Sequence, residues 1–174
     1  GLVRRQAAAL GEKEFMSFEH GTALTYASLD RDSDDLARKL AGLGVGPGDR
    51  VMVMLKNRIE FMLAMIGIMK IGALFVPINT ELKGAFLQHQ MRNAEPKAIF
   101  LDHGLRDAFD VVKGGSDNLA ATIYVAGDVP EQRPEVLAGA PAMAYEAFMA
   151  LDGAGDDVLV DAQPHDIACI MYTS

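Results

Sequence analysis

The sequence contains a single cysteine, Cys169. One cysteine excludes a framework of intramolecular disulfides and is typical of proteins from a reducing compartment. The first ten residues carry Arg4 and Arg5, but the alanine-rich patch after them is too short for the apolar region of a secretory signal. We therefore expect a cytoplasmic protein, with Cys169 inert in an apolar run.

Basic residues are scarce in one part of the chain. Residues 128–166 include nine acidic side chains and only one basic one, Arg133, and this stretch carries the entire net charge of −8. Such a balance argues against nucleic acid or an anionic membrane surface as the main partner. We interpret the acidic stretch as a solvated loop region.

The chain also lacks an uninterrupted apolar run long enough to cross a membrane. Lys70 is the only charged residue in 61–78, and it lies at the middle, where insertion costs about 2.5–3.5 kcal/mol. Gly72 and Pro77 interrupt the second half. The run predicts a buried helix followed by a buried strand, and no transmembrane segment.

With 174 residues, half of them hydrophobic, the chain can form one domain with a sizeable core. Apolar spacing predicts helices that alternate with short buried strands, and Thr25 or Ser28 can cap the first helix. The predicted helices are 29–43, 59–71, 83–93, 105–112 and 144–151, and the predicted strands are 51–55, 74–78, 98–101, 121–125 and 167–172. This alternation indicates an α/β fold, a mostly parallel sheet with helices on both faces.

Alternating glycines at 42, 44, 46 and 48 suggest a dinucleotide-binding loop, but their context does not fit one. That loop leaves a strand and opens a helix, whereas these glycines leave a helix and enter a strand. We interpret them as a helix end and a turn, with Gly44 in the left-handed conformation.

Polar residues follow two of the predicted strands, at the ends where open α/β sheets tend to bind ligands. Lys56, Asn57 and Arg58 follow the first strand, and Asp102 and His103 follow the third. We interpret residues 56–58 as the solvent-exposed start of a helix, and Asp102 and His103 as a solvated pair in a loop. We favour these interpretations over a ligand site. Asp102 is not expected to be a phosphate acceptor, because the residues after the first strand do not include the acidic pair that would hold Mg²⁺.

Metal ligation is not indicated by the histidines. None of the four has a second histidine or a cysteine at the close spacing that presents two ligands to one metal. No metal site is therefore predicted from the residues.

The residues with the most chemistry close the sequence. A predicted buried strand leads directly into Tyr172, Thr173 and Ser174. Hydroxyls and successive backbone N–H groups after a strand are typical of the start of a phosphate-binding loop.

Several segments in order resemble the AMP-forming acyl-CoA synthetases of the adenylate-forming superfamily, which also includes luciferases and peptide-synthetase adenylation domains. These segments are LTYASL (24–29), LGVGPGDRV (43–51), NRIEF (57–61), KIGA (70–73), VPIN (76–79), LKG (82–84) and DIACIMYTS (166–174). The VPIN and LKG segments are similar to the acyl-CoA synthetase branch, because adenylation domains usually carry an Asp-Pro-x-Tyr-Pro run there.

The resemblance implies a ligase that uses ATP, Mg²⁺ and CoA on a small-molecule carboxylate. It also implies that Thr173 and Ser174 open the ATP-phosphate loop. Other ATP contacts, the Mg²⁺ ligand, the acyl pocket and the catalytic lysine of the family lie further along. We therefore expect residues 1–174 to be the truncated N-terminal part of the large AMP-binding domain, inactive alone, with apolar surface exposed.

Two alternatives stay open at this point. The chain could be a self-contained, non-catalytic α/β module that binds a nucleotide or a protein. It could also belong to a peptide-synthetase adenylation domain. The sequence does not indicate which carboxylic acid is activated, and it leaves open whether the protein is a homo-oligomer.

Overall fold

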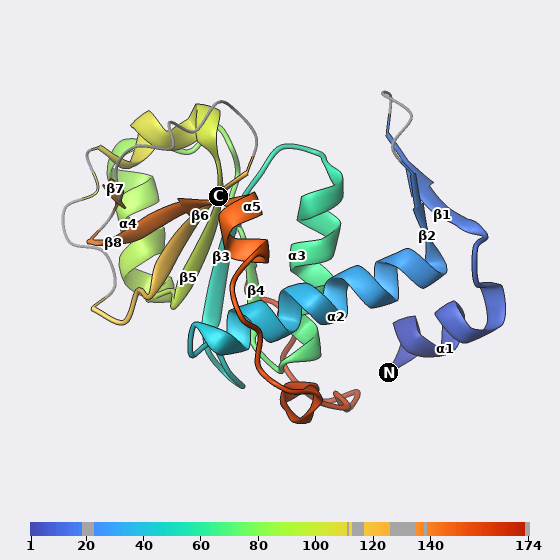
Figure 1. Cartoon of the computed structure of the whole chain (residues 1–174). Helices are drawn as coiled ribbons and strands as arrows, with labels where there is room; N and C mark the ends of the chain where they lie inside the picture. The colour runs from blue at the N-terminus through green and yellow to red at the C-terminus, as the bar shows by residue number, and fades with distance from the viewer. Residues whose placement is uncertain (19–22, 111, 113–116, 126–134, 138, 173–174) are drawn as a thin grey trace.

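The computed structural model describes residues 1–18, 23–110, 112, 117–125, 135–137 and 139–172. A six-stranded sheet with the order β4-β3-β5-β6-β8-β7 forms its centre (Figure 1). The strands are β3 (Arg50–Met54), β4 (Leu74–Pro77), β5 (Ala98–Asp102), β6 (Ala121–Val125), β7 (Glu135–Leu137) and β8 (Ala140–Ala144). All neighbours pair in parallel except β7 and β8, which are antiparallel.

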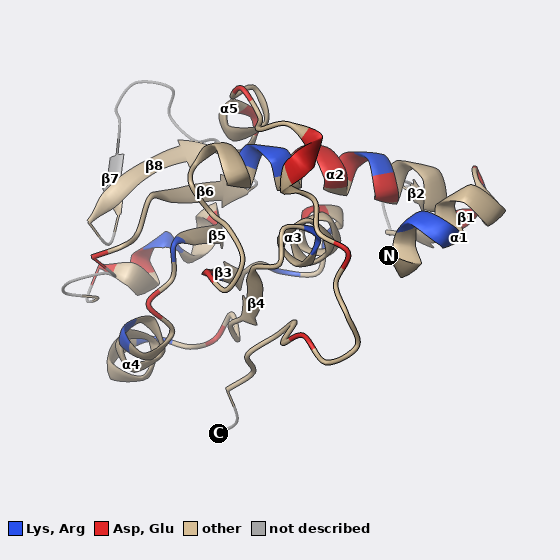
Figure 2. Cartoon of the chain, turned by 90° about the horizontal axis from the view of Figure 1, so that it is seen from below, with Lys and Arg blue, Asp and Glu red and all other residues tan. Residues whose placement is uncertain are grey.

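Helices cover both faces of this sheet, as predicted (Figure 2). The helices α2 (Tyr26–Gly42), α3 (Ile59–Lys70) and α5 (Tyr145–Met149) pack on one face. The other face is covered by α4 (Gly84–Ala94) and the 3₁₀ helix η1 (His103–Phe109). The mostly parallel α/β fold is thereby confirmed.

The central strands are continuous apolar runs because each contributes side chains to the hydrophobic cores on both faces of the sheet. Val51 and Val53 of β3 pack with α2 and α3, whereas Met52 and Met54 pack with α4. Successive strand side chains point to opposite faces, so a strand covered on both sides needs apolar residues at every position. An edge-to-face contact between Phe100 and Phe148, with ring centroids 5.6 Å apart, fixes α5 on β5.

Local signals set the ends of α2. The Thr25 side chain accepts a hydrogen bond from the Ser28 N–H at 3.0 Å, and the Ser28 hydroxyl accepts one from the Thr25 N–H at 2.9 Å. These two bonds form a capping box. Beyond the other end, Gly44 has φ 84°, the left-handed value predicted for it.

An N-terminal extension precedes this core and was not predicted. It consists of α1 (Leu2–Leu10), which packs alongside α2, and a hairpin of β1 (Glu14–Ser17) and β2 (Ala23–Thr25), which lies at the N-terminal end of α2 (Figure 1). No residue of α1 is buried. Instead, Arg4 forms ion pairs with Asp30 and Asp34 of α2.

Three sequence predictions differ from the structure. Residues predicted as a helix at 105–112 form the shorter η1, and the strands β7 and β8 arise where no element was predicted. The predicted buried strand at 167–172 is wrong, because only Cys169 pairs, as a parallel bridge to Phe75. Ile167 and Met171 are 69% and 75% exposed, since no element packs on that side of the segment among the described residues.

The short 3₁₀ helix η2 (Asp156–Val158) is the last element before that segment. Within the part of the chain that the structure describes, no helix has both the length and the apolar character needed to span a bilayer.

Candidate functional site

The carboxyl ends of β3 and β5 form the crevice of the sheet. The chain leaves β3 for β4 on one side and then crosses to β5 on the other, so the direction of winding reverses between β3 and β5. Open α/β sheets bind ligands outside the carboxyl ends of strands at such a reversal. A hollow of about 400 Å³ lies there, lined by Phe18, Lys56, Asn57, Arg58, Ile59, Glu60 and Asp102.

The structure thus brings together two groups of residues that the sequence placed only at the same edge. Arg58 Nη1 lies 3.5 Å from Asp102 Oδ2, although the two residues are 44 positions apart. Arg58 Nε also donates to Glu60 Oε2 at 2.9 Å. Asp102 is only 7% exposed, and its other carboxylate oxygen accepts the Gly104 N–H at 3.1 Å. Arg58 is therefore held between two carboxylates.

Lys56 and Asn57 lie beside this ion-pair cluster and are exposed at the rim of the hollow. An ammonium and a side-chain amide at this position could donate hydrogen bonds to an anionic or polar ligand. Glu60 and Asp102 balance the charge of Lys56 and Arg58, so the hollow as a whole is not strongly cationic.

His103 is directed elsewhere. Its ring makes an edge-to-face contact with Tyr124, with centroids 5.2 Å apart. The partner that the structure gives Asp102 across the crevice is Arg58 rather than His103. The adjacent Asp102 and His103 therefore do not form an acid–base pair in this arrangement.

Thr173 and Ser174, the predicted opening of the phosphate loop, lie outside the described residues. The segment before them is anchored at two points. The Phe75 N–H donates to the Ala168 carbonyl at 3.0 Å and the Ile170 N–H to the Phe75 carbonyl at 3.0 Å, while Tyr172 Oη donates to Asn93 Oδ1 at 2.9 Å. Asn93 lies near the end of α4, so the chain turns toward α4 after its contact with β4.

Burial affects two titratable groups of this segment. Burial raises the pKa of the Cys169 thiol, which keeps the unreactive thiol form dominant at neutral pH. Burial also raises the pKa of Tyr172, against a smaller opposing effect of Arg50. Tyr172 therefore stays a neutral hydrogen-bond donor toward Asn93.

The described residues do not fit a metal ion. No group of three His, Cys, Asp or Glu side chains in that part of the chain is arranged to hold one. We therefore derive no step through Mg²⁺ from these residues.

Comparison with known proteins decides the family. The family described as AMP-binding enzyme matches residues 3–174, nearly the whole chain. The chain belongs to the AMP-binding enzyme family. The family resemblance seen in the sequence motifs is thereby confirmed.

Relatives within the AMP-binding family come from two groups of ligases. A medium/long-chain-fatty-acid–CoA ligase of Mycobacterium tuberculosis is 31% identical over 128 residues, which is 74% of this chain and 20% of that ligase. Surfactin synthase subunit 1 of Bacillus subtilis is 28% identical over 134 residues, 74% of this chain and 4% of the synthase.

The fold is shared with solved structures. The anthranilate CoA ligase AuaEII, in complex with anthranoyl-AMP, superposes with a TM-score of 0.82 at 18% identity. That match covers 99% of this chain and 31% of the ligase chain, so the chain spans about a third of the structure it resembles.

Proposed function

We propose that the protein carrying this chain is an ATP-dependent carboxylate–CoA ligase, with residues 1–174 as the N-terminal part of its AMP-binding domain. The observation that carries the proposal is the 31% identity to a fatty-acid–CoA ligase over 74% of this chain. The VPIN and LKG segments at 76–79 and 82–84 support the same branch of the family.

The proposed reaction has two steps. A carboxylate oxygen attacks the α-phosphorus of ATP, the bond to pyrophosphate breaks, and an acyl-adenylate forms. The CoA thiolate then attacks the acyl carbon, AMP leaves with the electron pair of the broken bond, and the thioester is the product. Both steps require negative phosphate charge to be neutralised while the reacting atoms are aligned.

Thr173 and Ser174 are proposed to open the loop that receives the ATP phosphates. Their hydroxyls and backbone N–H groups would donate to phosphate oxygens. The rest of the loop and the binding sites for the acid, Mg²⁺ and CoA are assigned to parts of the protein outside residues 1–174. We therefore propose that this chain alone is inactive, and that the enzyme acts in the cytoplasm.

A panel of acids tests the proposal on the complete protein. Fatty acids, aromatic acids and amino acids are each supplied with ATP and labelled pyrophosphate, and exchange of label into ATP is measured. We expect exchange with at least one fatty or aromatic acid, and formation of its CoA thioester when CoA is added. The chain 1–174 serves as the control and should show no exchange.

Other outcomes contradict this assignment in different ways. Exchange that depends on an amino acid, with transfer to a carrier protein and not to CoA, would indicate a peptide-synthetase adenylation domain, as in the surfactin synthase relative. No exchange with any acid would refute the ligase and favour a non-catalytic module.

A further inference from the structure

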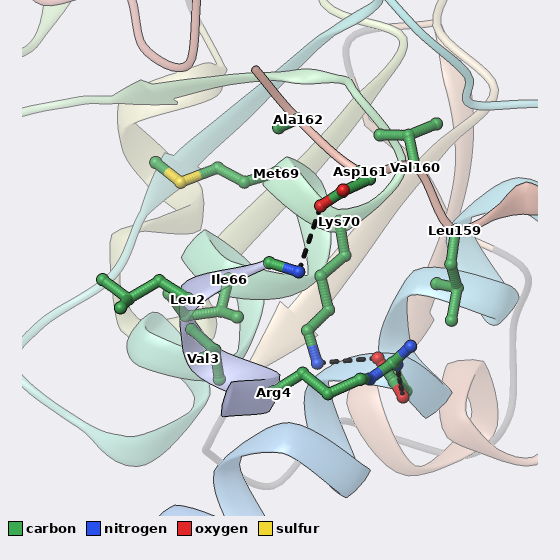
Figure 3. A pocket seen from close by; sticks show the side chains of 12 residues that line it. Leu2, Val3, Arg4, Ile66, Met69, Lys70, Leu159, Val160, Asp161 and Ala162 are labelled. Carbon is green, nitrogen blue, oxygen red and sulfur yellow. Dashed lines mark hydrogen bonds and ion pairs between the residues drawn. The ribbon is translucent and has the colours of Figure 1, made fainter. Parts of the chain in front are cut away.

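The segment 159–172, which leads into the proposed phosphate loop, is anchored to the core at successive points. At its start the Val160 N–H donates to the Lys70 carbonyl at 2.8 Å. Figure 3 shows this start along a hollow that α1 and α3 also line. Further along, Cys169 bridges to Phe75 between two main-chain hydrogen bonds of 3.0 Å. These anchors join main-chain atoms, so they set the course of the segment without depending on particular side chains.

The next anchor, directly before the loop, joins two side chains. Tyr172 Oη donates to Asn93 Oδ1 at 2.9 Å, and the Tyr172 ring packs against the core on the α4 side of the sheet. In the sequence Tyr172 is followed by Thr173, the first residue proposed to receive phosphate. A tether on Tyr172 therefore acts one residue before the proposed phosphate contacts.

Asn93 is a fixed point for this tether because the end of α4 is itself held in place. Arg50 of β3 donates through Nε to the Ala94 carbonyl at 2.6 Å and through Nη2 to the Glu95 carbonyl at 3.0 Å. The last carbonyls of a helix have no partners within the helix, so these bonds satisfy them. Asn93 thus connects the Tyr172 hydroxyl, by way of Arg50, to the central sheet.

A tether at this place affects how well a phosphate loop binds. Such a loop works by bringing N–H groups and hydroxyls together on phosphate oxygens. A loop that is free before binding loses conformational entropy when the ligand arrives, and this loss weakens affinity. A hydrogen bond that holds Tyr172 in advance reduces that cost for the residues that follow it.

We propose that Asn93 is a positioning residue for ATP, which holds through Tyr172 the start of the loop that receives the nucleotide phosphates. Asn93 does not touch the nucleotide in this proposal. The inference rests on the part of the proposed function that assigns Thr173 and Ser174 to phosphate. Its expected signature is weaker ATP binding with an unchanged reaction of preformed acyl-adenylate with CoA, because the β- and γ-phosphates are absent from that step.

ATP titrations and turnover assays on the complete protein test the proposal. Asn93→Leu removes the acceptor, whereas Asn93→Asp keeps an acceptor oxygen on a side chain of the same size. We expect Asn93→Leu to raise the Kd and the KM for ATP about three- to fivefold, the effect of one hydrogen bond at a partly exposed site. The kcat and the KM for the carboxylate should stay unchanged. Asn93→Asp should restore ATP binding.

A double-mutant cycle checks that Asn93 acts through Tyr172. Tyr172→Phe removes the donor and keeps the ring, so it should weaken ATP binding as much as Asn93→Leu does. The two substitutions together should weaken binding no more than either one alone, because both remove the same bond. The matched control is His89→Leu, at an exposed position one turn earlier on α4, and it should leave ATP binding unchanged.

Four results would overturn the proposal. These are an unchanged Kd for ATP in Asn93→Leu, additive effects in the double variant, an equal loss from His89→Leu, and an equal loss in the reaction of preformed acyl-adenylate with CoA. The last two would show a general effect on structure rather than positioning.

Failure of the ligase assignment would look different. A wild-type protein that binds ATP but forms no CoA thioester would contradict the ligase, while the ATP affinities of the variants would still decide the role of Asn93. A wild-type protein that does not bind ATP would overturn both proposals.

Discussion

Replacing Lys70 by methionine should loosen the contact between α2 and α3. Lys70 Nζ donates to the Asp30 carbonyl at 2.8 Å and to one carboxylate oxygen each of Asp30 and Asp34 at 2.6 Å. All three ammonium donors are thus used. The three side chains are only 15–16% exposed, so this cluster lies between a surface pair and a buried one.

The magnitude follows from that intermediate burial. Removing one partner of a buried pair costs about 3–5 kcal/mol, and an exposed pair contributes about 0–1 kcal/mol. Arg4 remains beside both carboxylates in the variant and compensates part of their charge. We therefore expect Lys70→Met to cost about 2 kcal/mol of local stability.

Native-state hydrogen exchange on the complete protein measures this effect. The amides of α2 and α3 should exchange about 30-fold faster, the equivalent of 2 kcal/mol. The matched control is Lys97→Met, because Lys97 Nζ lies 3.7 Å from Asp49 and both side chains are about twice as exposed. Adding Asp34→Asn to Lys70→Met should recover part of the loss. Equal exchange in the Lys70 and Lys97 variants would refute the reasoning.

Three further predictions concern packing, capping and reactivity. A Cβ on Gly67 would lie 2.7 Å from Leu36 Cδ2 and 3.0 Å from the Ser33 carbonyl oxygen, so Gly67→Ala should cost about 1–3 kcal/mol in denaturant unfolding. A Cβ on Gly46 meets no atom within 4 Å, so Gly46→Ala should leave the free energy of unfolding nearly unchanged. An equal loss of stability in the two variants would contradict the packing argument. Thr25→Ala should remove the capping bond of α2 and cost about 1 kcal/mol, whereas Thr25→Ser should cost little; equal thermal melts would count against the cap. Because burial raises the pKa of Cys169, its alkylation should reach half-maximal rate at a pH above that of an unstructured cysteine peptide, and a midpoint below it would contradict the assignment.

Local patterns in the sequence were sufficient to predict the core of the fold. The run VMVML predicted β3, and the two candidate caps Thr25 and Ser28 together with Gly44 predicted the ends of α2, where Thr25 is the N-cap. Each of these features acts through neighbouring residues. The antiparallel pair of β7 and β8 was missed, since its APAMA segment has weak strand propensity and forms a strand by pairing with β6. That pairing is a tertiary effect.

The candidate site was less predictable than the fold. The sequence placed Lys56 to Arg58 and Asp102 after strands, but their meeting depends on β3 and β5 being neighbours in the sheet. The apolar run at 167–172 predicts a buried strand, but hydrophobicity does not report whether a segment has neighbours on both sides. Strand pairing, which is set by the whole chain, supplies that information.

The most direct test of the proposed ligase is the stoichiometry of its products. The complete protein is supplied with an accepted carboxylate, ATP and CoA, and the nucleotide products and the thioester are quantified together. We predict AMP and thioester in equal amounts, with one pyrophosphate released for each. Release of ADP and phosphate, or AMP without CoA thioester, would contradict the assignment of this chain to a carboxylate–CoA ligase.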